Sequence, residues 1–65
     1  MKFILFNGTD YLRTDMITNI QIGTCSVYVY TNDGKSYMYS GYSKEDAKAK
    51  AAEFVTRLNK MLDNH

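Results

Sequence analysis

The sequence has no proline or tryptophan, one cysteine and one histidine. A single cysteine cannot form a disulfide within the chain, and free thiols are typical of reducing compartments. The apolar run at residues 3–6 is too short for a signal peptide or a membrane span. We therefore expect a cytoplasmic protein that does not enter a membrane.

An excess of charge of either sign is also missing. Eight Lys and Arg against seven Asp and Glu leave a net charge of +1 on 65 residues. Proteins that bind phosphate backbones usually carry a clear basic excess, so nucleic acid is a disfavoured partner. A domain of this size buries only about 60% of the surface of its unfolded chain. Because no disulfide or metal staple is available, we expect a complete small domain that self-associates.

The residue patterns of catalysis are absent as well. Cys25 would need a neighbouring base to act as a nucleophile, and the only histidine is His65 at the C-terminal end. Asp10, Asp15 and Asp33 are far apart in the sequence and lie at or near expected bends, where Asp is common. The glycines are scattered rather than clustered into a phosphate-binding loop. We predict no catalytic residue, no cofactor and no metal site.

One segment has the periodicity of a long amphipathic helix, from about residue 44 to 62. Ser43 is suited to the N-cap, and Glu45 and Asp46 favour the positive end of the helix dipole. Apolar residues then recur at steps of three and four, which gathers them on one face. They are Ala47, Ala51, Phe54, Val55, Leu58, Met61 and Leu62.

The rest of the chain reads as short strands separated by turn residues. Asn7-Gly8 and Asp33-Gly34 are dipeptides typical of tight hairpins. The expected strands cover approximately residues 2–6, 9–13, 16–22, 26–31 and 36–40. The sequence therefore predicts an α+β fold, in which an antiparallel β-meander of four to five strands carries the C-terminal helix across one face.

The register of the last hairpin determines which tyrosines share a face. A two-residue turn places Tyr30 opposite Tyr37, whereas a three-residue loop at 32–34 places Val29 opposite Tyr37. We favour the three-residue loop, because Gly34 then occupies its left-handed position. The predicted core consists of Met16, Ile20, Ile22, Val27, Val29, Ala51, Phe54, Val55, Leu58 and Leu62.

Six tyrosines are the unusual feature of the composition. Tyrosine rings pack well on a pleated sheet, so most of the six are expected to have a structural role. One helix, however, covers only one face of the sheet, so tyrosines on the other face are left uncovered. The first strand is apolar on both faces, with either Ile4 and Phe6 or Phe3 and Leu5 left outward. We predict a non-catalytic protein-interaction module that forms a homodimer through an aromatic sheet face or an edge strand. The interaction residues expected are Tyr28, Tyr30, Ile4, Phe6 and Tyr11.

The alternative function is binding of single-stranded nucleic acid or DNA as a regulator. Bases stack on exposed aromatic rings, and cations follow the phosphate backbone. The residues that would serve this role are Lys2, Arg13, Lys35, Tyr28 and Tyr30.

The order of segments resembles two groups of proteins. An Ile-rich strand at residues 17–22 is followed by a Val/Tyr hairpin with an Asp-Gly turn at residues 27–37. This succession is similar to small uncharacterised bacterial and phage proteins built as a β-meander with a C-terminal helix. It also resembles the central part of LytTR-type DNA-binding domains. Those domains continue into a basic strand region that contacts DNA, where this chain has its long helix, so no DNA-contacting residue is carried over.

Overall fold

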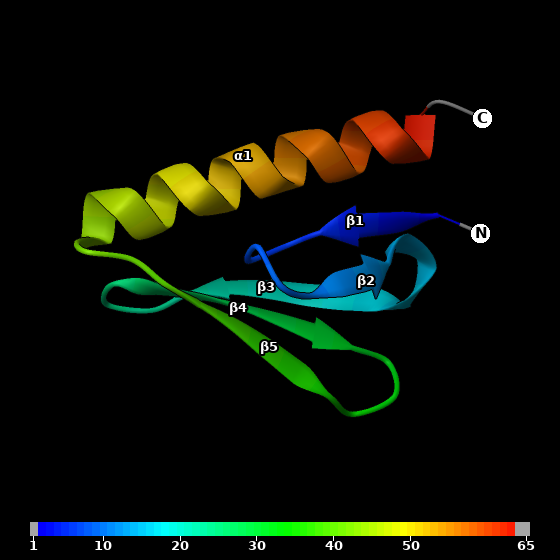
Figure 1. Ribbon diagram of the computed structural model, residues 1–65, viewed down its shortest axis with the longest axis horizontal. Helices are drawn as coiled ribbons and strands as arrows, with labels where there is room; N and C mark the ends of the chain where they lie inside the picture. Colours follow the sequence, from blue (N-terminus) through cyan, green and yellow to red (C-terminus); the bar gives the residue numbers. More distant parts are fainter. Residues whose placement is uncertain (1, 64–65) are drawn as a thin grey trace.

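A computed structural model describes residues 2–63 and has five strands and one long helix in that range (Figure 1). The α+β fold predicted from the sequence is confirmed, but its strands are divided between two antiparallel sheets, β1–β2 and β3–β4–β5. The elements are β1 (Phe3–Leu5), β2 (Tyr11–Arg13), the 3-10 turn η1 (Thr14–Met16), β3 (Ile17–Ile22), β4 (Ser26–Thr31), β5 (Ser36–Ser40) and α1 (Lys44–Asp63).

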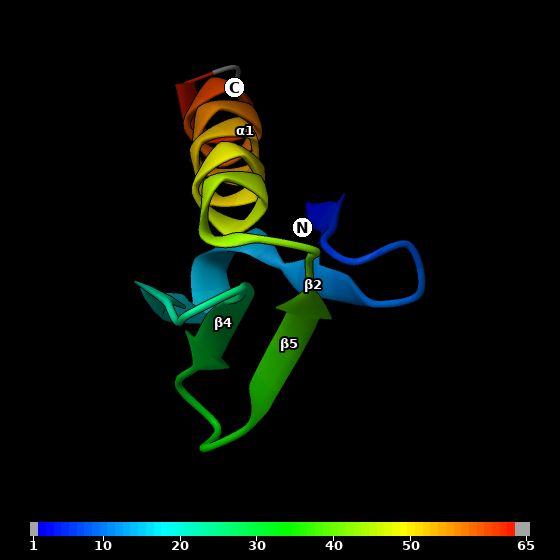
Figure 2. The same cartoon turned by 90° about the vertical axis from the view of Figure 1, so that its left-hand side faces the viewer.

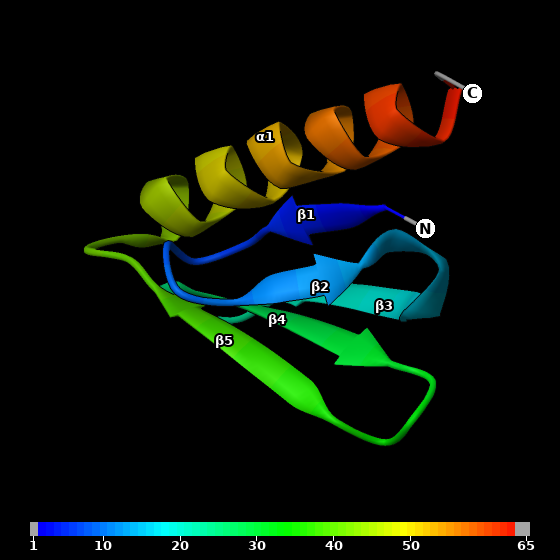
Figure 3. The ribbon, with the colours of Figure 1, turned by 45° about the vertical axis from the view of Figure 1, so that its right-hand side comes forward.

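The helix and the small β1–β2 sheet lie side by side on one face of the three-stranded sheet (Figures 1 and 2). α1 packs on β3 and β4, while the loop that joins β1 to β2 reaches β5. A hydrogen bond of 2.8 Å from Arg57 to the carbonyl of Leu5 joins α1 to β1. The opposite face of the three-stranded sheet carries no other element of the described chain (Figure 3).

The start of α1 is fixed by side-chain capping. The backbone N–H of Asp46 donates to Ser43 Oγ over 3.1 Å, as expected for an N-cap serine. The carboxylate of Asp46 reaches back and accepts the N–H of Tyr42 over 3.0 Å. This reciprocal pair satisfies two backbone donors that have no partner inside the helix.

Removing the cap gives a first test of the local structure. We expect Ser43→Ala to lower the free energy of unfolding by about 1 kcal/mol, because a helix N–H loses its acceptor. Urea denaturation followed by circular dichroism measures this loss. Ser43→Asp is the matched control, since aspartate also caps and should keep near-wild-type stability. Equal stability of all three proteins would show that this cap contributes nothing.

The β4–β5 hairpin adopts the three-residue loop favoured by the sequence. Val29 pairs with Tyr37, and Val27 pairs with Tyr39. Gly34 has a φ of 85°, which lies in the left-handed region that glycine enters at no steric cost. The register therefore places Val27, Val29, Tyr37 and Tyr39 on the face toward α1.

The buried core differs from the predicted one at both ends of the chain. Ile22, Val55 and Leu62 were expected inside but are 47%, 36% and 44% exposed, and Met16 is only half-buried. Ile4, Phe6 and Leu12 take their places, because the β1–β2 sheet lies beside the helix on the same face of the larger sheet. The buried apolar residues are Ile4, Phe6, Leu12, Val27, Val29, Ala47, Ala51, Phe54 and Leu58.

An aromatic pair lies where β1 and α1 meet. The rings of Phe6 and Phe54 are 5.0 Å apart between centroids and meet edge to face. Both side chains are fully buried, and this geometry is favoured by the ring quadrupoles. Ile20, Tyr37 and Tyr39 pack against this core while remaining partly exposed. The core is therefore shared by both sheets and the helix.

Candidate interaction surface

The predicted interaction residues of the first strand are not on the surface. Ile4 and Phe6 are 2% and 0% exposed, so their expected place in an outward patch is wrong. The alternative pair faces outward instead, with Phe3 49% exposed and Leu5 half-buried. The exposed Tyr11 pairs with Leu5 and lies on the same outward face of the β1–β2 sheet. This face is separate from the one that bears Tyr28 and Tyr30.

Tyr28 and Tyr30 lie on the face of the three-stranded sheet that points away from α1. Both are half-buried by their own strand neighbours. A Cβ on Gly23 would lie 3.1 Å from the Tyr28 ring, and the Tyr30 hydroxyl donates to Gln21 over 3.3 Å. The remaining large apolar side chain of this face is Met38, which is 49% exposed. The face is a mixed aromatic and polar surface rather than a continuous apolar one.

The cations of the nucleic-acid alternative do not gather around these rings. Lys2 bonds to the Met61 carbonyl over 2.9 Å, on the side of the molecule that carries the helix. Arg13 forms a 2.8 Å ion pair with Asp15, and this hydrogen bonding lowers the pKa of the Asp15 carboxyl. Lys35 lies in the β4–β5 turn. The five residues of that prediction are thus spread over several surfaces.

Burial and hydrogen bonds perturb a few titratable groups within residues 2–63. Cys25 is a half-buried free thiol, and no group of three metal-binding side chains was found in this part of the chain. Partial burial raises the pKa of the Tyr39 hydroxyl, with the nearby Asp46 charge adding to it. A hydrogen bond from Thr31 lowers the pKa of Asp33. His65 lies outside the described residues.

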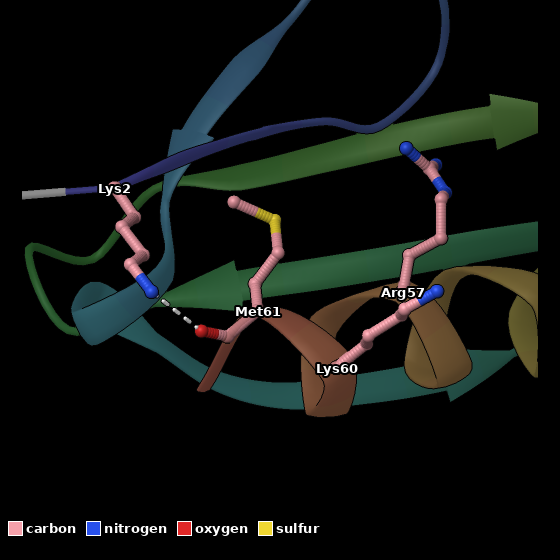
Figure 4. A pocket seen from close by; sticks show the side chains of 4 residues that line it. All are labelled: Lys2, Arg57, Lys60 and Met61. Atoms are coloured by element: carbon pink, nitrogen blue, oxygen red, sulfur yellow. Dashed lines mark hydrogen bonds between the residues drawn. The ribbon is translucent and has the colours of Figure 1, made fainter. Parts of the chain in front are cut away.

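A basic hollow lies between β1 and the C-terminal end of α1 (Figure 4). Its lining consists of Lys2, Arg57, Lys60 and Met61. Lys2 binds a carbonyl of the last helical turn, and Arg57 pairs with Glu53 and also donates to β1. Two of its three cations therefore already hold the helix end against the first strand.

No helix within the described residues is long and apolar enough to cross a membrane.

The two edges of the three-stranded sheet differ. At β5, the amide of Asn7 donates to the Met38 carbonyl over 2.9 Å, so the β1–β2 loop contacts this edge at one carbonyl. The Asn7 side chain also accepts the N–H of Asp10 over 2.9 Å, which holds the loop in place. At β3, no strand of residues 2–63 pairs on the outer side. We call the outer side of β3 the open edge.

A hollow runs along the open edge, between β3 and α1, and is mainly apolar in one part and mixed in the other. One part is lined by Ile20, Ile22 and Val55 with the small helix residues Ala51 and Ala52. A second part continues from Ile20 and Val55 toward the other end of β3 and is lined also by Ile17, Thr18, Asn19, Leu58 and Asn59. We name the two parts together the β3–α1 groove. Its lining carries one charged side chain, which is Lys48.

Sequence reasoning assigned the groove residues Ile22 and Val55 to the core. Alternation in β3 and the helical stripe identify both correctly as facing the interface between sheet and helix. What the pattern does not contain is the position of β3 at the edge of its sheet, where the helix overlaps the strand only partly. The sequence predicts association through either an aromatic sheet face or an edge strand. β3 is an edge strand, and it borders the groove.

Comparison of this chain with protein-family models, curated proteins and solved structures found no match. No relative therefore assigns a ligand to any of these surfaces, and the resemblance to LytTR-type domains stays a prediction. Among the described residues, the open edge and the groove combine unpaired backbone with exposed apolar side chains.

Proposed function

We propose that this protein is a non-catalytic protein-interaction module that self-associates through the open edge and the β3–α1 groove. The observation that carries the proposal is the difference between the two sheet edges. At the β5 edge Asn7 binds the outward carbonyl of Met38, whereas no strand pairs on the outer side of β3 in residues 2–63. Folded proteins usually block exposed strand edges, because an unblocked edge pairs with other chains.

The backbone groups at the open edge follow from the pairing of β3 with β4. The N–H of Gly23 donates to the Ser26 carbonyl over 2.7 Å, which makes these two residues a hydrogen-bonded pair. Hydrogen-bonded and non-bonded pairs alternate along an antiparallel ladder. Ile22 and Ile20, which face Val27 and Val29, therefore direct their N–H and C=O groups away from β4. An added strand would find donors and acceptors at both positions.

Exposed apolar side chains flank these backbone groups. Ile22 is 47% exposed and Val55 is 36% exposed, on opposite walls of the groove. Fully burying such a side chain is worth roughly 1.5–3 kcal/mol, so covering the exposed parts adds a share of this to the backbone hydrogen bonds. Polar edge contacts and apolar groove contacts thus favour the same partner position. The outer tyrosine face offers no comparable backbone donors.

A charge placed in the groove tests this function. Ile22→Lys should abolish self-association, because edge lysines block strand addition and the ammonium group would have to be desolvated. Sedimentation velocity at high micromolar concentration should show a wild-type dimer and an Ile22→Lys monomer. Met38→Lys adds the same charge at a residue of similar exposure on the outer sheet face, and it should remain dimeric.

Two results would overturn the proposal. One is a wild-type monomer throughout this concentration range, which would leave the open edge without a use in self-association. The other is loss of the dimer in Met38→Lys but not in Ile22→Lys, which would move the contact to the tyrosine face. Anisotropy of a labelled single-stranded oligonucleotide at low salt tests the alternative, and binding lost in Tyr28→Ala would favour it.

A further inference from the structure

We infer that the partner at the open edge is a second copy of this chain, placed antiparallel about a twofold axis that passes beside Gln21. This arrangement rests on the proposed function and specifies its geometry. Two β3 strands would pair edge to edge, so the two three-stranded sheets would form one continuous sheet. Both copies of α1 would then lie on the same face of that sheet, because the axis runs perpendicular to it.

The regular part of β3 selects the register. A new ladder forms between residues whose backbone groups point outward, which are Ile20 and Ile22. Pairing Ile20 of each copy with Ile22 of the other uses both residues in both copies. Centring the axis on Ile20 would bring Ile22 opposite Thr18, where the strand has a bulge between Ile17 and Asn19. Centring it on Ile22 would pair Ile20 with a residue beyond the end of the strand.

The position of the helix fits this pairing. α1 packs on both β3 and β4. A helix axis midway between these two strands is half a strand spacing inward from β3. The twofold axis lies half a spacing outward from β3. With strands about 4.8 Å apart, the two helices would be roughly 10 Å apart, compared with about 8–10 Å for packed helices. The two helices would therefore meet across the axis and close the groove from above.

The side chains at this meeting are compatible with close contact. The face of α1 above the open edge presents Lys48, Ala52, Val55 and Asn59, in which Lys48 is the single charge. Ile20 borders Val55 in the groove, so the axis beside Gln21 passes near the middle of this row. Ala52 of each copy would face Val55 of the second copy. Each Lys48 would meet Asn59 of the second copy, which avoids contact between like charges.

A disulfide at the axis tests the register. In the background Cys25→Ser, Gln21→Cys places two thiols on strands whose facing residues form a non-hydrogen-bonded pair. The Cα atoms of such a pair are about 4.5 Å apart, within the range of about 4.4–6.8 Å that disulfides require. Under mild oxidation we expect most of this protein to become covalent dimer on non-reducing gels. Under reducing conditions it should sediment like the wild type.

Asn19→Cys in the same background is the matched control. Asn19 is exposed on the same face of β3, but the register sets it opposite Gly23 of the second copy. The two Asn19 positions would then be about 14 Å apart, at roughly 3.4 Å for each of four residues, so cross-linking should stay at background. A wild-type dimer with no cross-link at Gln21→Cys, or with equal cross-linking at Asn19→Cys, overturns this register while the proposed function stands. A wild-type monomer overturns both.

Discussion

Phe6→Ala is expected to lower the free energy of unfolding by about 3–5 kcal/mol. The side chain is fully buried and meets the Phe54 ring edge to face at 5.0 Å, so its removal leaves a cavity between β1 and α1. Domains are commonly stable by only about 5–15 kcal/mol, and a chain of this size lies toward the lower end. We therefore expect a protein that is largely unfolded at 37 °C, as measured by thermal and urea denaturation.

Phe3→Ala is the control for this experiment, since it removes the same ring at the start of β1, three residues before Phe6. Phe3 is 49% exposed on the outward face of β1, so its loss should cost much less than that of Phe6. Similar losses for the two variants would mean that β1 does not pack with one face inward. A larger loss of stability for Phe3→Ala would mean that the face of β1 that bears Phe3 is the one packed inward.

Leu58→Ala should cost about 2–5 kcal/mol, which is the second large effect that we expect. Leu58 is one of the four buried residues of α1, and it also borders the β3–α1 groove. Its removal takes apolar contacts from beneath the C-terminal half of the helix, so the whole domain should unfold at a lower urea concentration. Fluorescence of the tyrosines and circular dichroism should report one shared transition.

Leu62→Ala is the matched control within the same helix. Leu62 is 44% exposed near the helix end, and its truncation should lower the stability by much less than that of Leu58. A loss of stability near zero for Leu58→Ala in urea denaturation would show that the apolar face of α1 does not pack in the core. A larger loss for Leu62→Ala would indicate that the helix is rotated about its axis.

The sequence carried enough information for the segments whose patterns have one solution. Ser43 and the apolar steps that follow it predict a helix ending at about residue 62, and α1 runs Lys44–Asp63. Gly34 favours the three-residue loop, and the observed register sets Val29 opposite Tyr37. In both cases a local rule, capping or left-handed glycine, points to the same structure as the hydrophobic pattern.

The first strand could not be placed, because its pattern has more than one solution. Phe3, Ile4, Leu5 and Phe6 are all large and apolar, so alternation does not distinguish the inward face from the outward one. The pairing of β1 and β2 as a separate sheet depends on contacts with α1 that are distant in sequence. The same difficulty affected Val55, since it lies at the margin of a stripe whose width is set by the sheet beneath it.

The place of the candidate surface in the fold could not be predicted from the sequence. Six tyrosines drew attention to the outer sheet face, whereas the structure combines apolar side chains with unpaired backbone along β3. The order of strands in a sheet decides which strand is at the edge, and hydrophobic periodicity within each strand does not contain it. Three-dimensional contacts were needed to see that Ile22 and Val55 face each other across a groove.

The side-chain amide of Asn7, bonded to the Met38 carbonyl at β5, also bears on how large an assembly can grow. A sheet with two free edges can add strands at both and extend into a fibre. Under the proposed function, the Asn7 bond obstructs strand addition at β5, and a twofold contact at β3 would use the other edge in both copies. Assembly would then terminate at a pair. One short loop, far in sequence from β3, would thereby separate a finite complex from open-ended polymerisation.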